Sequence, residues 1–174
     1  MIIAFAGLPG SGKSYFAHVL TERYKQFVVL DKDIVRSVLF PGTLTEYSST
    51  QDDFCIDVIL QSAGMIIKRN PEMHIVIDGR TFSKRNQVAQ VCHAAEHMGI
   101  TYKFVQFICD DETIKKRLEI QADTHLAKNR DYTLYRRLKE EAEPLLIPHL
   151  TLYSDEVQEE KIRKFLEYID GKTC

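Results

Sequence analysis

Short, continuous apolar runs alternate along this chain with longer segments in which apolar residues recur every three or four positions. Short continuous runs are typical of strands buried on both faces, and the longer spacing is typical of amphipathic helices. The pattern predicts strands at residues 2–6, 27–30, 74–77, 102–108 and 149–153. It predicts helices at residues 14–24, 54–69, 84–98, from about 110, 133–141 and 155–169.

Two of these helices show which side is expected to face the core. In the first, Ser83 is a typical N-cap residue and Gly99 stands where a C′ glycine belongs. Its inward stripe is Val88, Val91, Cys92 and Ala95. His93, Glu96 and His97 match a zinc-protease pattern, but the stripe leaves Glu96 and His97 on the solvent side, which favours an ordinary surface. In the closing helix, the inward residues are expected to be Val157, Ile162, Phe165, Leu166 and Ile169.

The alternation of strands and helices predicts an α/β fold. Strands connected by helices of this length form right-handed βαβ units, which build a mostly parallel sheet. A parallel sheet binds its ligand at the carboxyl ends of the strands. Polar residues that directly follow a predicted strand are therefore the first candidates for a functional site.

Length and composition narrow the picture further. The chain has 174 residues, so we expect residues 1–174 to form one domain. No stretch approaches the ~20 apolar residues of a membrane span and the N-terminus lacks the basic region of a signal peptide, so we expect no membrane partner and a cytoplasmic location. The four cysteines show no CxxC spacing and are expected to be free thiols. The net charge of −2 gives no support to a nucleic-acid partner.

The stretch GLPGSGKS connects the first predicted strand to the first predicted helix and fits the pattern G-x-x-x-x-G-K-[ST]. Glycine-rich backbone lets N–H groups turn inward around a phosphate, and the helix N-terminus adds its positive dipole end. The lysine would neutralise the β- and γ-phosphates, and the serine hydroxyl would complete a Mg²⁺ shell. We therefore expect ATP with Mg²⁺ to bind at Gly7, Leu8, Pro9, Gly10, Ser11, Gly12, Lys13, Ser14 and Tyr15.

Charged residues directly follow the second predicted strand in the stretch VVLDKDIVRSVLF. Asp33 and Arg36 lie one helical turn apart, so they could orient a hydroxyl proton and fix a substrate or spread transition-state charge. Asp31 could hold a water bound to Mg²⁺. The alternative is an N-cap aspartate followed by an ordinary surface ion pair.

The third predicted strand runs into the stretch HIVIDGRTFSKRNQ. Asp78 stands where a Walker B carboxylate would bind Mg²⁺ through water or orient the nucleophile. Arg80 and Arg85 follow and could grip an anionic substrate or phosphate. Surface ion pairs explain the two arginines equally well.

A polar segment at about 121–131, between two predicted helices, is suited to a mobile lid. Lys128 and Arg130 would close onto the phosphates, exclude water and stabilise developing charge. Arg117, which precedes this segment, could pack on the adenine. Each of these residues could instead be a solvated helix charge. A solvated helix is also favoured over a single-strand nucleic-acid surface for Tyr132, Tyr135, Arg136 and Arg137.

Taken together, these stretches resemble the P-loop kinases that act on hydroxyl groups. The resemblance is to the broad group that includes the polynucleotide 5′-hydroxyl kinase domain, zeta toxins and chloramphenicol phosphotransferase, and it rests on GLPGSGKS, LDKDIVR, IVIDGRTFSKR and the basic lid. It implies a three-layer P-loop fold with a parallel five-stranded sheet of order 2-3-1-4-5 and a short lid. It also implies that Asp33 acts as base, Arg36 contacts the acceptor and Asp78 supports the site.

The chain departs from the better-known members of this group. Nothing after Arg36 matches the substrate motif of adenylylsulfate kinase, and Gln121 stands where many relatives have a second arginine. The sequence therefore predicts an ATP-dependent kinase that phosphorylates a hydroxyl group of a small molecule. Two alternatives stay open. One is a 5′-hydroxyl polynucleotide kinase with a basic channel built from Arg36, Arg80, Lys84 and Arg85, and the other is a nucleotide-dependent switch module.

Overall fold

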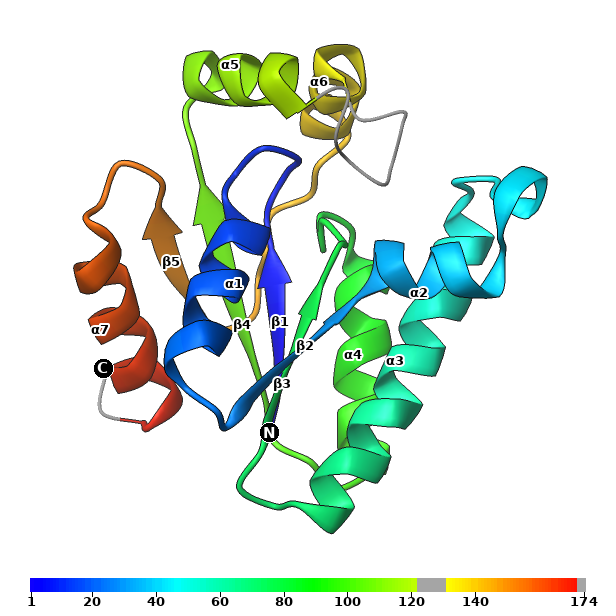
Figure 1. Ribbon diagram of the computed structural model, residues 1–174, viewed down its shortest axis with the longest axis vertical. Coiled ribbons are helices and arrows are strands. Elements are labelled where there is room, and N and C mark those ends of the chain that lie inside the picture. Colours follow the sequence, from blue (N-terminus) through cyan, green and yellow to red (C-terminus); the bar gives the residue numbers. More distant parts are fainter. Residues whose placement is uncertain (122–130, 172–174) are drawn as a thin grey trace.

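The computed structural model describes residues 1–121 and 131–171 as a parallel sheet surrounded by helices (Figure 1). The strands are β1 (Ile2–Ala6), β2 (Phe27–Asp31), β3 (His74–Asp78), β4 (Tyr102–Ile108) and β5 (His149–Tyr153). The helices are α1 (Lys13–Arg23), α2 (Lys32–Leu39), α3 (Ser49–Arg69), α4 (Arg85–His97), α5 (Asp111–Gln121), α6 (Tyr132–Glu140) and α7 (Gln158–Ile169), with a 3₁₀ turn at Gly42–Leu44.

The strands lie in the order β2-β3-β1-β4-β5, which confirms the predicted sheet. The first strand of the chain lies in the middle, because Ile2 is opposite Ile75 of β3 on one side and Tyr102 of β4 on the other. The carboxyl ends of β1, β2 and β3 therefore meet at one edge of the sheet. This edge carries the phosphate loop and the acidic residues that follow β2 and β3.

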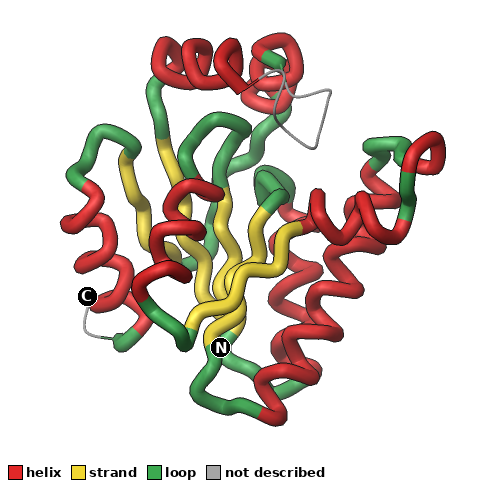
Figure 2. The backbone as a smooth tube through the Cα atoms, in the orientation of Figure 1, coloured by secondary structure: helices red, strands yellow, loops and turns green. Residues whose placement is uncertain are grey.

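The two faces of the sheet are covered by different helices (Figure 2). Ile3 and Phe5 of β1 belong to a core that includes Phe16 of α1 and Phe165 of α7. Ile2, Ala4 and Ala6 belong to the opposite core, which includes residues of α3 and α4. All five β1 residues are thus buried, and this explains why the strand appears in the sequence as an unbroken apolar run.

Most predicted elements are confirmed within a few residues. The stripe on α4 faces the core, with Val91 and Ala95 fully buried, while Glu96 and His97 are exposed as expected. Gly99 follows α4 with a φ angle of 65°, as a C′ glycine does. The expectation for Val157 was wrong: α7 begins one residue later, and Val157 is 71% exposed.

The predicted N-cap of α4 was also wrong. The cap position belongs to Lys84, whose side chain makes no capping hydrogen bond. Ser83 lies one residue earlier, where its hydroxyl pairs with the Thr81 hydroxyl at 2.8 Å and its N–H donates to Gln87 Oε1 at 3.0 Å. The side chain of Gln87 therefore supports the start of α4 from inside the helix, a contact that sequence spacing does not show.

Helix α2 was not among the predicted helices, and α3 was predicted too short. α3 begins at Ser49 rather than near residue 54, because the Ser48 hydroxyl accepts the Gln51 N–H at 3.2 Å and caps the helix earlier.

Along the described ranges, no helix has the length and apolar character needed to cross a membrane. Cys55, Cys92 and Cys109 are free thiols, as expected.

Candidate active site

The phosphate loop joins the end of β1 to the start of α1. Gly7, Gly10 and Gly12 have φ angles of 145°, 82° and 98°, which other residues rarely adopt. A Cβ atom at Gly7 would lie 2.6 Å from the carbonyl oxygen of Phe107, so no side chain fits there. The loop therefore has the open backbone and the adjacent helix N-terminus that bind a phosphate group.

A cavity of about 420 Å³ lies on the loop and on the β5–α7 connection. Its wall includes Arg117, whose Nη1 donates to the Gly10 carbonyl at 3.0 Å and contacts Cys109 Sγ at 3.6 Å. These contacts anchor α5 to the phosphate loop. The cavity is lined by Gly10, Ser11, Gly12, Lys13, Ser14, Tyr15, Phe107, Arg117, Tyr153, Ser154 and Lys161. We call it the Arg117 cavity.

A second cavity, of about 210 Å³, lies between the phosphate loop and α2, α3 and α6, and we call it the α2–α6 cavity. It is lined by Pro9, Lys13, Ser14, Asp31, Lys32, Asp33, Arg36, Tyr47, Asp52, Asp78, Gly79, Arg80, Thr81, Gln87, Leu134, Arg137 and Leu138. The structure thus brings together residues that follow β1, β2 and β3, as the topology predicts. Lys13 and Ser14 line both cavities. A phosphate chain held by these two residues would have one end in each cavity.

Lys13 carries the positive charge of the phosphate loop and is only 6% exposed. Its Nζ donates to the carbonyl oxygens of Gly7 at 2.6 Å and Leu8 at 3.2 Å. These bonds hold the ammonium group beside the backbone amides of the loop. The position is the one in which an ammonium group can neutralise a phosphate bound to those amides.

Asp31 and Asp78 are the last residues of two adjacent strands and lie directly opposite each other in the β2–β3 register. Asp31 caps α2, because its Oδ1 accepts the N–H groups of Asp33 at 2.7 Å and Ile34 at 3.3 Å. Burial and the nearby negative charge of Asp78 raise the pKa of Asp31. Asp78 is 1% exposed, and its Oδ1 lacks a hydrogen-bond partner in the described part of the chain.

These features fit a divalent cation. A buried carboxylate oxygen without a partner, beside a second carboxylate, is stabilised by added positive charge. Magnesium keeps several waters and binds phosphate oxygens, so it does not need a cage of three acidic residues. Residues 1–121 and 131–171 contain no such cage. Ser14, Asp31 and Asp78 are the residues that would hold Mg²⁺ here, directly or through water.

Gly79 follows Asp78 and leaves room for the Asp31 carboxylate and the start of α2. Its φ angle is 85°, and a Cβ atom would lie 2.9 Å from Asp31 Oδ1 and 3.0 Å from the Lys32 backbone nitrogen. Gly79→Ala should lower the free energy of unfolding by about 2–4 kcal/mol, from left-handed backbone strain and the lost cap. Urea unfolding measures this loss.

Gly99→Ala provides the matched control for that experiment. The φ angle of Gly99 is 65°, but an added Cβ would meet no atom within 4 Å. This variant should therefore lose only the backbone term, about 1–2 kcal/mol. Equal losses in the two variants would contradict the crowding of Asp31 by a side chain at position 79.

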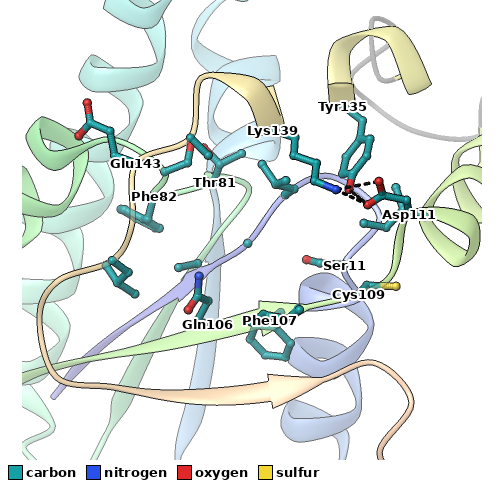
Figure 3. A pocket seen from close by; sticks show the side chains of 18 residues that line it. Ser11, Thr81, Phe82, Gln106, Phe107, Cys109, Asp111, Tyr135, Lys139 and Glu143 are labelled. Atoms are coloured by element: carbon teal, nitrogen blue, oxygen red, sulfur yellow. Dashed lines mark hydrogen bonds and ion pairs between the residues drawn. The ribbon is translucent and has the colours of Figure 1, made fainter. Parts of the chain in front are cut away.

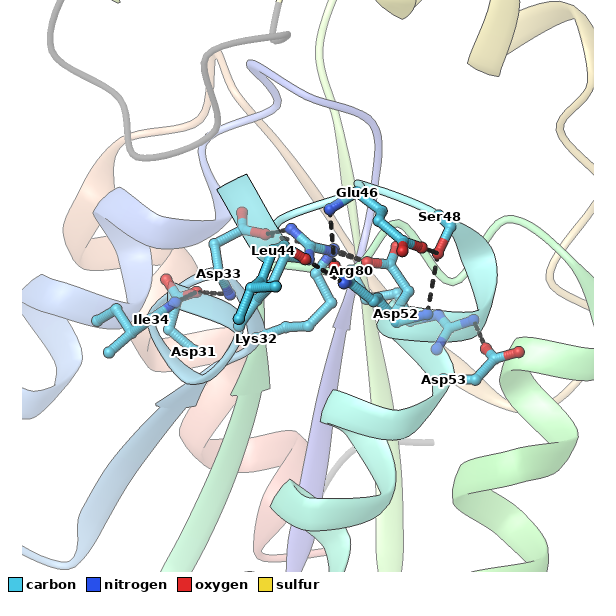
Figure 4. Close-up of polar contacts among 12 residues, drawn as sticks. Asp31, Lys32, Asp33, Ile34, Leu44, Glu46, Ser48, Asp52, Asp53 and Arg80 are labelled. Carbon is cyan, nitrogen blue, oxygen red and sulfur yellow. Dashed lines mark hydrogen bonds and ion pairs between the residues drawn. The ribbon is translucent and has the colours of Figure 1, made fainter. Parts of the chain in front are cut away.

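Four side chains at the α2–α6 cavity form a closed ring of ion pairs (Figure 4). Asp33 pairs with Arg36 at 2.8 Å and with Lys32 at 3.3 Å. Asp52, from α3, pairs with Lys32 at 2.9 Å and also with Arg36. Desolvation by burial lowers the pKa of Lys32 to about 8. Two positive and two negative groups thus compensate one another inside the site.

The ring explains the unusual orientation of α2. Its buried residues are Lys32 and Arg36, whereas Ile34 and Val38 are 53% and 71% exposed. The guanidinium carbon of Arg36 also lies 5.2 Å from the centroid of the Tyr47 ring. Arg36 is therefore not part of a surface ion pair, which was the alternative interpretation of this stretch.

The two arginines expected after β3 have different positions. Arg80 is 3% exposed and lines the α2–α6 cavity, where its guanidinium group binds Asp53 and donates to Gln90 Oε1 at 3.1 Å. The side chain of Arg85 is 76% exposed and pairs with Glu143 at 3.8 Å. Only Arg80 is therefore brought into the site, and Arg85 is not among the residues that line either cavity.

The predicted lid can be followed only in part. Lys128 and Arg130 lie outside the described residues. The helix that follows, α6, contributes Leu134, Arg137 and Leu138 to the α2–α6 cavity. Arg137 was interpreted from the sequence as a solvated charge; it is exposed, as expected, and it also lines this cavity. The spacing of Leu134, Arg137 and Leu138, which places them on one helix face, is the signal that could have identified it.

Helix α6 is held in this position by α5. Lys139 Nζ donates to both Asp111 carboxylate oxygens, at 2.6 and 2.7 Å, and the Tyr135 hydroxyl donates to Asp111 Oδ1 at 2.7 Å (Figure 3). Burial, together with the hydrogen bond to Asp111, raises the pKa of Tyr135. These residues line a third cavity, of about 270 Å³, together with Ser11 and Cys109. The contacts fix the face of α6 that carries Arg137 toward the site.

A family model described as an AAA domain matches residues 2–145, from β1 to beyond α6. The chain belongs to this AAA domain family. The match covers the phosphate loop, α2 and the residues that follow β3. A comparison of the AAA domain with curated proteins gives no match.

Solved structures share the fold of this AAA domain. A candidate kinase from Chloroflexus aurantiacus has a TM-score of 0.74 at 14% identity, over 99% of this chain and 97% of the other. The APS kinase CysC from Mycobacterium tuberculosis, solved with AMPPNP and APS, has a TM-score of 0.72 at 18% identity, over 97% and 96%. Kti12 from Chaetomium thermophilum, solved with ADP-AlF3, has a TM-score of 0.69 at 13% identity, over all of both chains. The likeness establishes the fold.

Proposed function

We propose that this protein is a kinase that transfers the γ-phosphoryl group of ATP, bound with Mg²⁺, to a hydroxyl group of a small molecule. The α2–α6 cavity carries this proposal, because Lys13, Ser14 and the carboxylate of Asp33 line one small space. Enzymatic phosphoryl transfer depends almost entirely on positioning and on electrostatic stabilisation. A cavity that joins a phosphate site to an orienting carboxylate supplies the positioning. The cations that line the cavity supply the electrostatic stabilisation.

The phosphate loop would bind the donor. Its backbone amides and Lys13 would hold the β- and γ-phosphates, and Mg²⁺, when bound, would neutralise charge on the phosphate oxygens. The Arg117 cavity, which Tyr15 and Tyr153 also line, would receive the nucleobase and the ribose of ATP. The APS kinase with the same fold was solved with the ATP analogue AMPPNP, which supports ATP as the donor.

Asp33 would orient the acceptor. One carboxylate oxygen would accept a hydrogen bond from the acceptor hydroxyl and take up its proton as the hydroxyl oxygen bonds to the γ-phosphorus. At the same time the bond from the γ-phosphorus to the bridging oxygen of ADP breaks, and the proton later passes to solvent. Arg36, with both Nη atoms held by carboxylates, would act on the acceptor through Asp33.

Arg137 is the cation that we propose for the developing charge on the transferred group. It lines the cavity from α6, and Pro9, Lys13 and Ser14 line the same cavity. Arg137→Ala should lower kcat by about 10- to 1000-fold and change the KM for ATP little, since the charge it meets develops in the transition state. Steady-state kinetics with varied ATP measure both constants.

The adjacent variant Arg136→Ala is the control for Arg137. Its side chain is 67% exposed, pairs with Glu140 at 3.6 Å and is not among the residues of the α2–α6 cavity. Its kinetic constants should equal those of the unmodified enzyme. Equal losses in the two variants would assign the effect to the helix rather than to the guanidinium group that faces the cavity.

The charge distribution supports a small acceptor over a polynucleotide. Arg36 and Arg80 are buried against aspartates, and Arg85 pairs with Glu143. Lys84 Nζ donates to the Glu141 carbonyl at 2.6 Å. Two of the four cations expected to form a basic channel are therefore buried, the other two have partners within the protein, and the net charge is −2. Binding of a polyanion needs cations that can replace its counterions.

A product screen tests the proposed function. The protein, Mg²⁺ and ATP labelled at the γ-phosphate are incubated with a panel of hydroxyl-bearing metabolites and, separately, with oligonucleotides that carry a 5′-hydroxyl. We expect label in a small-molecule product. Label transferred only to oligonucleotides would establish the polynucleotide kinase instead. Release of labelled phosphate alone, with every panel member unmodified, would favour a nucleotide-dependent switch.

A further inference from the structure

Asp52 lies in the first turn of α3, far in sequence from any strand end. The Ser48 cap starts this helix early enough to bring residue 52 against α2. Asp52 is the α3 residue that lines the α2–α6 cavity. The position is secured on its other side by Gln51, which is 7% exposed and donates from Nε2 to the Leu44 carbonyl at 2.7 Å.

The contacts of Asp52 are shared with the candidate base. Lys32 and Arg36, one helical turn apart on α2, each contact both Asp52 and Asp33. The side chains of Lys32 and Arg36 are 8% and 4% exposed, so both cations are buried in the ring. Each cation therefore lies between two carboxylates, one from α2 and one from α3.

This arrangement determines where the Asp33 carboxylate can lie. Without the charge of Asp52, two buried cations would have Asp33 as their one remaining partner in the ring. Removal of one partner leaves a buried charge uncompensated, which favours a closer approach to the opposite charge that remains. Lys32 and Arg36 would then draw both carboxylate oxygens of Asp33 toward themselves. The oxygens would move away from the acceptor hydroxyl group that Asp33 is proposed to orient.

We infer that Asp52 is a positioning residue for Asp33. Asp52 holds Arg36 and Lys32, and a carboxylate oxygen of Asp33 therefore stays directed into the cavity. The inference rests on the proposed function, because it assigns a use to the orientation of Asp33. Asp52 itself touches neither the nucleotide nor the transferred group in this scheme. Its effect on turnover is exerted through the two cations.

Three variants test the role of Asp52. Asp52→Asn keeps the shape and removes the charge, while Asp52→Glu keeps the charge. Asp57→Asn makes the same chemical change elsewhere on α3, at an exposed residue whose carboxylate accepts Gln90 Nε2 at 2.8 Å. The kinetic assay uses labelled ATP with the acceptor found in the product screen, and thermal unfolding confirms that each variant is folded at the assay temperature.

The kinetic pattern separates positioning from simple tethering of α2 to α3. Asp52→Asn should lower kcat by about 10- to 100-fold with an unchanged KM for ATP, because misplacement by about 1 Å has this effect on an oriented group. Asp52→Glu should recover part of kcat, and Asp57→Asn should leave both constants unchanged. An unchanged kcat in Asp52→Asn would overturn the inference, as would a loss that Asp57→Asn reproduces.

A second measurement is independent of activity. The Nε–H group of Arg36 is buried, so it should give a separate ¹H–¹⁵N cross-peak, assigned by its absence in Arg36→Lys. Asp52→Asn should shift or broaden this cross-peak, whereas Asp57→Asn should not. An unchanged cross-peak in Asp52→Asn would overturn the inference. If the cross-peak changes but the protein transfers phosphate to no acceptor, the contact of Asp52 with Arg36 is supported and the kinase function is refuted instead.

Discussion

Asp33→Asn is expected to lower the rate of phosphoryl transfer by about 100- to 10,000-fold, the usual contribution of a positioned acid or base. An amide cannot take up the proton of the acceptor hydroxyl. ATP affinity should remain close to that of the unmodified protein, because Asp33 follows β2, whereas the proposed phosphate site is the loop after β1. Initial rates with saturating acceptor and calorimetric titration of ATP measure the two quantities.

The same substitution disturbs the ion-pair ring, so its stability must be measured as well. Removal of one partner from a buried ion pair destabilises a protein by about 3–5 kcal/mol, and the 14% exposure of the Asp33 side chain reduces this figure. Asp33→Glu keeps the charge and serves as the second variant. Full activity in a folded Asp33→Asn protein would refute the assignment of Asp33 as the base.

Lys13→Ala should lower the affinity for ATP by about 100-fold, since charge-assisted hydrogen bonds contribute about 1.5–3 kcal/mol and each 1.4 kcal/mol is tenfold. The loss has two sources. The phosphates lose a cation, and the loop loses the bonds from Lys13 to the carbonyl groups of Gly7 and Leu8. Titration with ATP and Mg²⁺ measures the change, and no phosphoryl transfer should remain at ATP concentrations that saturate the unmodified protein.

Lys25→Ala is the control for Lys13→Ala. Lys25 is an exposed lysine in the connection between α1 and β2, away from the carboxyl edge of the sheet. The Lys25→Ala variant should bind ATP with the affinity of the unmodified protein. A Lys13→Ala variant with normal ATP affinity would show that the glycine-rich loop is not the phosphate site and would remove the basis of the proposed mechanism.

The sequence allowed the sheet to be predicted well, for a physical reason. Strands covered on both faces must be apolar throughout, so β1 and the other central strands stand out as unbroken runs. The phosphate loop could be predicted because its function constrains consecutive residues. Asp31, Asp33 and Asp78 could be found because parallel strands end at one edge and the residues after them meet there.

The missed residues depend on contacts between distant parts of the chain. Asp52 follows no strand, and its importance appears only when α3 lies against α2. Arg137 is the exposed charge that the sequence indicated, but its place at the cavity depends on contacts between two helices, from Lys139 to Asp111, that sequence spacing does not show. Arg85 shows the opposite error: it has the spacing of a site residue, but Glu143 holds it elsewhere.

The central position of β1 has a consequence for synthesis of the chain. β1 pairs with strands that are synthesised about seventy and one hundred residues after it, at Ile75 and Tyr102. Until β3 and β4 have left the ribosome, β1 is an apolar strand with two open edges, and such segments aggregate. The phosphate loop, which follows β1 directly, can thus reach its final shape only after β3 and β4 have been translated.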